Sequence, residues 1–274
     1  MVVSVCVAGA TGWAGRAVAE AVLAAEDLRL RSAVSRSAAG QDLGQAWTGQ
    51  PVGVPVFGRV GEEALAGVDV LVEFTSHRAA RANTLTALER GVAVVIGSSG
   101  LTAEDFTAIE TAARAAGVGV VAAGNFSLTA AMALASATLA ARYLPSWEII
   151  DYAAAAKPDA PSGTAREMAE RLAAVATPRV EVPVERTSGQ TEARGGTIAG
   201  TQIHSVRLPS FVVSTEIVFA GPDERLTIRH DAGATPAPYV AGALLAIRAV
   251  TSHSGLVRGL DTLLLHPTSG TSEK

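Results

Sequence analysis

The chain has 274 residues, which is enough for one large domain or two smaller ones with a real hydrophobic core. Hydrophobic residues make up 49% of the sequence but aromatic residues only 4%, so small aliphatic side chains must do most of the packing. The net charge of −4 argues against a nucleic-acid partner, and the single cysteine, Cys6, excludes an internal disulfide and fits a reducing compartment.

The N-terminal half alternates between two patterns. Short runs rich in valine and isoleucine are typical of buried strands, at residues 4–9, 28–35, 68–75, 91–97 and 118–124. Stretches with helical spacing lie between them, at residues 13–25, 77–90 and 103–116. Near-continuous apolar strands separated by helices indicate a parallel sheet covered on both faces. We therefore predict a Rossmann-like α/β dinucleotide-binding domain.

The sequence pattern changes after Asn125. The pattern predicts a helix over 126–143, a strand over 147–153, a helix over about 164–175, antiparallel strands within 178–230 and a closing helix over about 238–251. This indicates a second, α+β domain with a mixed or antiparallel sheet. We predict a dinucleotide-binding domain formed by 1–124 with 234–274, and a substrate-binding domain formed by 125–233.

No membrane or metal site is expected. The start "MVVSVCVAGA" lacks the basic residues of a signal peptide and is better interpreted as a strand. The apolar run 239–250 is too short to span a bilayer and contains Arg248. The sequence predicts a cytoplasmic protein whose last residues, 266–274, are a frayed end.

A glycine-rich loop links the first predicted strand to the first helix. "CVAGATGWAGRAV" spaces Gly9, Gly12 and Gly15 three residues apart. Glycines there allow a tight turn and a close approach of the backbone to a pyrophosphate, which the helix N-terminus then attracts. The plain alternative is a tight turn without a ligand. The strand–loop–helix context favours a dinucleotide site.

The end of the second predicted strand bears on the choice of cofactor. An NAD-preferring site usually has an acidic residue there, but this chain has Ser35, Arg36 and Ser37. A guanidinium between hydroxyls suits the 2′-phosphate of NADPH. The alternative is an exposed loop arginine. We predict NADPH in preference to NADH.

Two further loops follow predicted strands. "FTSHRAA" (74–80) and "IGSSG" (96–100) are expected to border the ligand crevice of a doubly wound sheet. The alternative is ordinary helix capping by Ser76 and Thr102.

The stretch "KPDAPSGTAREMAERL" predicts an anion-binding turn. Ser162 and Thr164 place hydroxyls at a helix start, Gly163 removes bulk, and Lys157 supplies positive charge. Free amides together with two hydroxyls suit a carboxylate or a phosphate. Helix capping alone is the alternative, but capping does not account for the preceding lysine.

These motifs, in this order, resemble the dihydrodipicolinate reductase family. The resemblance rests on "VAGATGWAGR", "VLVEFTSH", "VVIGSSGLT", "GNFSLTAAM" and "EIIDYAAAAKPDAPSGTA", and runs from about residue 3 to residue 250. It implies a Rossmann-like domain, an α+β domain whose sheet assembles a homotetramer, and hydride transfer from NAD(P)H to a cyclic imine-type substrate held between the domains.

The resemblance also implies roles for individual residues. The matching cofactor positions are Gly9, Thr11, Gly12, Trp13, Ala14, Arg36, Phe74, Thr75, Gly97, Ser99, Gly124, Asn125 and Phe126. The matching positions for the substrate carboxylate are Lys157, Ser162, Gly163 and Thr164, with Ser99 in place of the family's usual threonine.

The chain departs from the family pattern at the opening of the anion turn. Ala153 and Ala154 occupy the positions of two histidines, of which the first is regarded as the general acid and the second helps to hold a carboxylate. A positioned general acid is worth about 10²–10⁴-fold. "VRLPSFVVSTEIVF" with Pro209, and "HDAGAT" with Ala234 and Thr235, depart as well. We expect a less polar and roomier site.

The main hypothesis is a family member with a changed substrate. It would use NADPH to reduce a C=N or conjugated C=C bond of a small, often cyclic, imine or enamine carboxylate in amino-acid or secondary metabolism. Lys157 and Tyr152 are the candidate proton donors, with His77, His204 and His230 as weaker ones. The alternatives are a genuine reductase of lysine biosynthesis, a silent NADPH-binding protein, and a non-redox enzyme that uses the same pocket.

Overall fold

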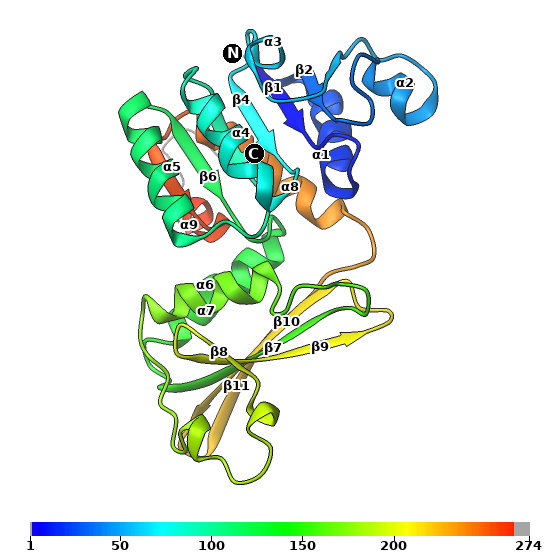
Figure 1. Ribbon diagram of the computed structural model, residues 1–274. Coiled ribbons are helices and arrows are strands. Elements are labelled where there is room, and N and C mark those ends of the chain that lie inside the picture. The colour runs from blue at the N-terminus through cyan, green and yellow to red at the C-terminus, as the bar shows by residue number, and fades with distance from the viewer. Residues whose placement is uncertain (1, 266–274) are drawn as a thin grey trace. The chain divides into compact units, whose positions relative to one another are not determined.

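The computed structural model describes residues 2–265, and the chain divides into two compact units (Figure 1). The first unit is Met1–Leu128 with Pro236–Lys274, and the second is Thr129–Thr235. The predicted frayed end at 266–274 lies outside the described residues. Among the described helices, none has the length and apolar character required to cross a membrane.

The first unit is built on a parallel sheet of seven strands in the order β12-β6-β5-β4-β1-β2-β3. Its strands are β1 (Val3–Ala8), β2 (Leu28–Val34), β3 (Val56–Phe57), β4 (Val70–Glu73), β5 (Ala93–Ile96), β6 (Gly119–Ala122) and β12 (Gly255–Arg258). Its helices are α1 (Trp13–Ala24), α2 (Leu43–Thr48), α3 (Glu62–Leu65), α4 (His77–Leu88), α5 (Ala103–Ala116), α8 (Ala237–Val250) and α9 (Leu260–Leu265). The predicted Rossmann-like class is confirmed.

Helices cover both faces of this sheet, as the buried strands require. On one face, Cys6 and Ala8 of β1 share a core with Ile109 of α5 and Leu88 of α4. Because side chains alternate along a strand, Val5 and Val7 point to the other face, where α1 and α8 pack together. Burial raises the pKa of Cys6 to about 12, so its thiol is an inert core group.

The short elements of the first unit carry no periodic signal in the sequence. Helix α2 depends on Asp42, whose carboxylate accepts the amides of Gly44 and Gln45 at 2.9 and 3.2 Å. The same carboxylate accepts the amides of Val52 and Val54 at 2.8 and 2.9 Å, which closes the loop that leads to β3. One side chain therefore accepts four amides of this loop, alongside the backbone hydrogen bond from Leu43 to the Val54 carbonyl.

The second unit holds a sheet of five strands in the order β11-β10-β7-β9-β8. The strands are β7 (Ser146–Ala154), β8 (Gly196–Ile198), β9 (Thr201–Leu208), β10 (Val213–Gly221) and β11 (Glu224–Asp231). The helices are α6 (Leu128–Ala140), α7 (Gly163–Ala173) and two 3₁₀ turns, Val184–Arg186 and Thr191–Arg194. The predicted mixed sheet is confirmed. Within 178–230, the expected antiparallel pairing is found between β8 and β9 and between β10 and β11. The strands of this range begin only at Gly196, after the two 3₁₀ turns, and β9 runs parallel to β7, which precedes the range.

Helices α6 and α7 cover one face of the second sheet. Trp147 and Ile149 of β7 point to that face and pack with Leu134 of α6 and Leu172 of α7. Alternation along β7 places Asp151 and Ala153 on the same face, both with no exposed surface. Tyr152 points to the opposite, partly exposed face.

Candidate active site

The glycine loop after β1 is shaped by close backbone approaches. Gly9 has a φ of 84°, and a Cβ there would lie 2.3 Å from the carbonyl oxygen of Phe74. A Cβ on Gly15 would lie 2.2 Å from the carbonyl oxygen of Gly9. Gly12 is the N-cap of α1 and supplies no side-chain cap, so no side chain occupies the amides of the first turn. The loop therefore fits the backbone cradle that a pyrophosphate requires.

A cavity of about 680 Å³ lies beside this loop. It is lined at the carboxyl ends of β1, β2, β3 and β4 by residues that include Gly9, Thr11, Gly12, Arg36, Arg59, Phe74, Thr75 and Arg78. No aspartate or glutamate is among its lining residues. The hydroxyls of Thr11 and Ser35 are 2.8 Å apart, and those of Ser35 and Ser37 are 3.2 Å apart. The cavity offers hydroxyls and guanidinium groups and suits an anionic dinucleotide.

Trp13 and Ala14 begin helix α1. The Trp13 side chain is 52% exposed, and its ring stands edge-on to Tyr239 with the ring centroids 5.7 Å apart. Burial raises the pKa of Tyr239, so its hydroxyl is held in the protonated form.

Glu73, at the end of β4, joins two of the loops predicted to hold the cofactor. Its side chain has no exposed surface. Oε1 accepts the Thr75 amide at 2.8 Å, the Thr75 hydroxyl in a short contact, and the Ser98 hydroxyl at 3.2 Å. Oε2 accepts the Asn83 amide group at 2.7 Å. The carboxylate thus fixes the loops after β4 and β5 and connects them to α4.

Aromatic packing holds the same loops from the other side. A Cβ on Gly97 would lie 2.4 Å from the ring of Phe74, so this approach requires glycine. The rings of Phe74 and Phe126 are 5.7 Å apart, and Phe126 is only 1% exposed. Phe126 is therefore placed as a support for Phe74 rather than as an open surface. Asn125 is buried beside it and accepts the Ser127 amide at 2.8 Å.

The structure brings the predicted cofactor residues together in the first unit. They follow β1, β2, β4, β5 and β6, which are neighbours in one sheet, and Ser99 and Gly124 are exposed where β5 and β6 end. In open α/β sheets, ligands bind at this edge. The predicted carboxylate residues Lys157, Ser162, Gly163 and Thr164 belong to the second unit.

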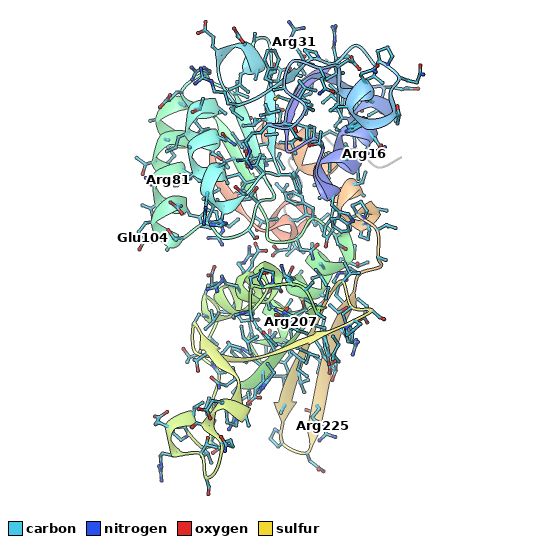
Figure 2. The ribbon with its side chains drawn as sticks, turned by 45° about the vertical axis from the view of Figure 1, so that its right-hand side comes forward. Arg16, Arg31, Arg81, Glu104, Arg207 and Arg225 are labelled. Atoms are coloured by element: carbon cyan, nitrogen blue, oxygen red, sulfur yellow. The ribbon has the colours of Figure 1, made fainter. Side chains whose placement is uncertain are left out.

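The anion turn is held by Asp151 of β7. Its carboxylate accepts the Ser162 amide at 2.8 Å, the Ser162 hydroxyl at 2.6 Å and the Ser205 hydroxyl at 3.2 Å. The guanidinium of Arg207 donates to the same carboxylate at 2.8 Å and to the carbonyl oxygen of Asp159 at 2.7 Å. Figure 2 shows Arg207 among the strands of this sheet. The ion pair between the buried Asp151 and the partly exposed Arg207 therefore ties the turn to β7 and β9.

Ser162 and Gly163 contribute to the turn in different ways. Ser162 is 2% exposed, and its hydroxyl also accepts the Ala165 amide at 3.3 Å as the N-cap of α7. The amide and the hydroxyl of Ser162 both donate to Asp151, so neither is available to an anion. Ser162 can therefore help to bind an anion only by fixing the shape of the turn. The amide of Gly163 is used by no other described residue. The amide of Gly163 therefore remains open to an anion.

Lys157 follows β7 and carries the positive charge next to this turn. Its amide bonds to the Ala154 carbonyl at 2.9 Å, and its ammonium group pairs with Asp159 at 2.7 Å. The Lys157 side chain is 28% exposed, so water screens this pair and a ligand can compete for the ammonium group.

The two alanines at the family's histidine positions differ in environment. Ala153 has no exposed surface, whereas Ala154 is half-buried. The expectation of a roomier site is therefore wrong at Ala153, because surrounding atoms already fill the space around it.

Tyr152 points away from the anion turn. Its ring stacks on Phe211 at 5.1 Å, and the guanidinium of Arg229 lies 5.0 Å from the ring centroid. These contacts favour a packing role, and proton donation by Tyr152 stays a prediction.

The candidate histidines are also placed. His204 pairs with Glu148 at 2.7 Å, and His77 begins α4 as an exposed residue. His230 is 6% exposed, and its Nδ1 lies 3.2 Å from the Thr129 hydroxyl. Burial lowers the pKa of His230, although the negative charge of Asp231 opposes this shift. The lowered pKa favours the neutral ring.

Sequence reasoning missed Glu73, Asp151, Arg207, Arg59 and Arg78. The local signal for Glu73 was an acidic residue directly after three apolar ones in "VDVLVEFT". The corresponding signal for Asp151 was a carboxylate at an inward position of β7. Arg59 and Arg78 carry no such signal, because only the fold brings them to the cavity.

Comparisons with known proteins agree with this architecture. The family model described as dihydrodipicolinate reductase, N-terminus, matches residues 3–126, and the one described as dihydrodipicolinate reductase, C-terminus, matches residues 119–264. A 4-hydroxy-tetrahydrodipicolinate reductase of Moorella thermoacetica is 41% identical over 270 residues, covering 96% of this chain and 98% of the relative. One of Desulfitobacterium hafniense is 36% identical over 264 residues, with coverages of 96% and 98%.

Solved structures with the same fold include a member of this reductase family. A dipicolinate-bound dihydrodipicolinate reductase from Paenisporosarcina sp. TG-14 matches with a TM-score of 0.77 and 29% identity, over 96% of this chain and all of that chain. An amine dehydrogenase from Mycobacterium smegmatis matches with a TM-score of 0.64 at 16% identity, over 93% and 94% of the chains, and shares the fold alone. The protein is an NAD(P)H-dependent oxidoreductase, and the chain belongs to the dihydrodipicolinate reductase family.

Proposed function

We propose that this protein reduces 4-hydroxy-tetrahydrodipicolinate with NADPH in lysine biosynthesis. The observation that carries the proposal is the 41% identity, over 96% of the chain, to a relative of that name. The expectation of a changed substrate is therefore no longer the leading one. The glycine-loop cavity and the turn held by Asp151 supply the two binding functions that such a reductase needs.

The preference for NADPH rests on Arg36. This residue lines the cavity two positions beyond β2, where an NAD-specific site usually has a carboxylate. Its guanidinium bonds to no other described residue, so it is available to a 2′-phosphate. Bound NADPH supplies the hydride for the C=N or conjugated C=C bond of the substrate.

The substrate is proposed to be held through its carboxylates. Lys157 offers an exchangeable ammonium group, and Gly163 offers an open amide at the positive end of α7. Thr164 and Ser99 stay predicted contacts of the same substrate. Since addition of a hydride must be balanced by a proton, Lys157 is also the proposed donor or stabiliser of the protonated nitrogen.

A second candidate is reduction of another small imine or enamine carboxylate. Ala153 and Ala154 favour it, because neither methyl group can donate a proton or bind a charge. A substrate that arrives as a protonated iminium, with a single carboxylate, would not need either histidine.

Complementation separates these candidates. A strain that lacks its 4-hydroxy-tetrahydrodipicolinate reductase and is supplied with this chain should grow without lysine and diaminopimelate, whereas Lys157→Ala at equal expression should not support growth. Failure of the wild-type chain at good expression would remove the lysine-pathway proposal. Oxidation of NADPH with one member of an imine and enone panel would then support the second candidate.

We keep the homotetramer as part of the proposal. The face of the second sheet opposite α6 and α7 presents Ile150, Tyr152 and Val218, each partly buried in the single chain. Native mass spectrometry should show four copies, and a monomer at micromolar concentration would contradict this.

A further inference from the structure

We infer that Arg59 forms, together with Arg36, a two-arginine site for the 2′-phosphate of NADPH. Arg59 would then be a specificity-determining residue for the cofactor. This inference rests on the proposed use of NADPH.

The first support is the register of two parallel strands. Strands β2 and β3 pair with Val34 opposite Phe57, and the Ser35 amide bonds to the Phe57 carbonyl at 2.9 Å. Arg36 and Arg59 each stand two residues beyond this registered pair. The two chain segments leave the sheet side by side in the same direction, and both arginines line the 680 Å³ cavity.

The second support is the charge balance of the cavity. Neither guanidinium bonds to another described residue, and no carboxylate is among the lining residues of the cavity. Two cations that line one cavity without a counterion repel each other. A phosphate monoester carries about −1.5 to −2 charges at neutral pH, so one arginine leaves it partly uncompensated and two match it. The guanidinium fork also suits bidentate binding to phosphate oxygens.

The third support is the placing of the hydroxyls. Thr11, Ser35 and Ser37 form a chain of hydroxyl contacts at 2.8 and 3.2 Å in the wall that carries Arg36. Hydroxyls can donate to a third phosphate oxygen or hydrogen-bond to the ribose.

A third arginine in the cavity provides a matched control. Arg78 is the second residue of α4 and follows β4, which is separated from β2 by β1 in the sheet. It has the same charge and is also exposed, but it does not share the β2–β3 register. We assign it no part in selecting the 2′-phosphate.

Isothermal titration with NADPH, NADH, adenosine 2′,5′-bisphosphate and AMP tests the inference. Arg36→Ala and Arg59→Ala should each weaken NADPH binding by about tenfold or more and NADH binding by less than about threefold. Arg59→Lys should retain part of the preference for NADPH over NADH, because lysine keeps the positive charge but lacks the planar guanidinium that binds two phosphate oxygens. Arg78→Ala should change both cofactors by the same factor. In each variant, the affinity for adenosine 2′,5′-bisphosphate should change as the affinity for NADPH does, and the affinity for AMP as the affinity for NADH does.

The outcomes separate this inference from the proposed function. A wild-type preference for NADPH that Arg59→Ala leaves unchanged overturns the two-arginine site alone. An equal loss of both cofactors in Arg59→Ala also overturns it. A wild-type protein that binds NADH as tightly as NADPH overturns the assignment of NADPH together with the two-arginine site.

Discussion

The carboxylate of Asp151 accepts both the backbone amide of Ser162, at 2.8 Å, and its hydroxyl, at 2.6 Å. One buried side chain on β7 therefore sets the first turn of α7, whose Gly163 amide is the proposed contact of the substrate. The charge on Asp151 is balanced by Arg207.

Loss of the Asp151 contacts should destabilise the second unit in a graded way. Ser162→Ala removes the N-cap and one hydrogen bond to a carboxylate and should cost about 1–2 kcal/mol of unfolding free energy. Asp151→Asn leaves Arg207 without its counter-charge and should cost about 3–5 kcal/mol. Urea unfolding of the second unit measures both. Ser205→Ala, which removes a longer contact with the same carboxylate, is the control and should cost less than Ser162→Ala. An equal loss would contradict the capping role of Ser162.

Glu73→Gln should weaken NADPH binding. Glutamine has one acceptor oxygen where glutamate has two, so its NH₂ group must face either the donors of Thr75 and Ser98 or the amide group of Asn83. It also lacks the negative charge that strengthens these hydrogen bonds, so the loops after β4 and β5 are held less firmly. We expect a loss of affinity of about 1–2 kcal/mol, measured by titration of cofactor fluorescence, with partial recovery in Glu73→Asp. Ser32→Ala is the control, because it removes a buried hydrogen bond to the Ala64 carbonyl in the same unit. Ser32→Ala should lower stability and leave NADPH affinity unchanged. Wild-type NADPH affinity in Glu73→Gln would contradict the role of Glu73 in holding the cofactor loops.

Histidines placed back at the family positions should behave differently from each other. Ala153 is fully buried, so Ala153→His should overpack the sheet and cost about 1–3 kcal/mol. Ala154 is half-buried, and Ala154→His should fold with close to wild-type stability. Thermal unfolding of the two single variants decides this. Equal melting temperatures would show that the space beside Ala153 adapts more easily than its burial indicates.

Acid should destabilise the second unit partly through His230. Burial lowers the pKa of His230 in the folded protein, so the unfolded chain binds a proton that the folded chain excludes. The stabilisation is fully present above the unfolded pKa of about 6.5 and is lost as the pH falls below it. Unfolding free energies measured between pH 7.5 and 5.5 should therefore decline, and His230→Asn should make that decline shallower. If the unfolding free energy falls with pH equally steeply in the wild type and in His230→Asn, His230 does not contribute to the acid sensitivity.

The elements predicted well from the sequence are those with local signals. The helix expected over 103–116 begins and ends there because Thr102 and Asp105 form a capping box and Gly117 closes the helix with a φ of 66°. Helix α2 was missed because its stability comes from contacts of Asp42 with amides up to 12 residues away. Propensity within a short window cannot show such contacts.

The same distinction applies to the site. The glycine loop is contiguous, so its glycine spacing and its place between a predicted strand and a predicted helix indicated it. The pairing of Asp151 with Arg207 joins residues 56 apart in the chain. Arg36 and Arg59 line the same cavity only because of the register of β2 and β3. The filled space at Ala153 depends on packing in three dimensions and cannot be inferred from an alanine in a sequence.

The proposed reduction is measured by following NADPH absorbance with freshly generated 4-hydroxy-tetrahydrodipicolinate as substrate. We expect the wild-type protein to oxidise NADPH only when this substrate is present. Lys157→Ala should lower kcat/KM by about 10²-fold or more and leave NADPH affinity unchanged. Wild-type protein that binds NADPH but shows no oxidation above background with this substrate would contradict the proposed reduction.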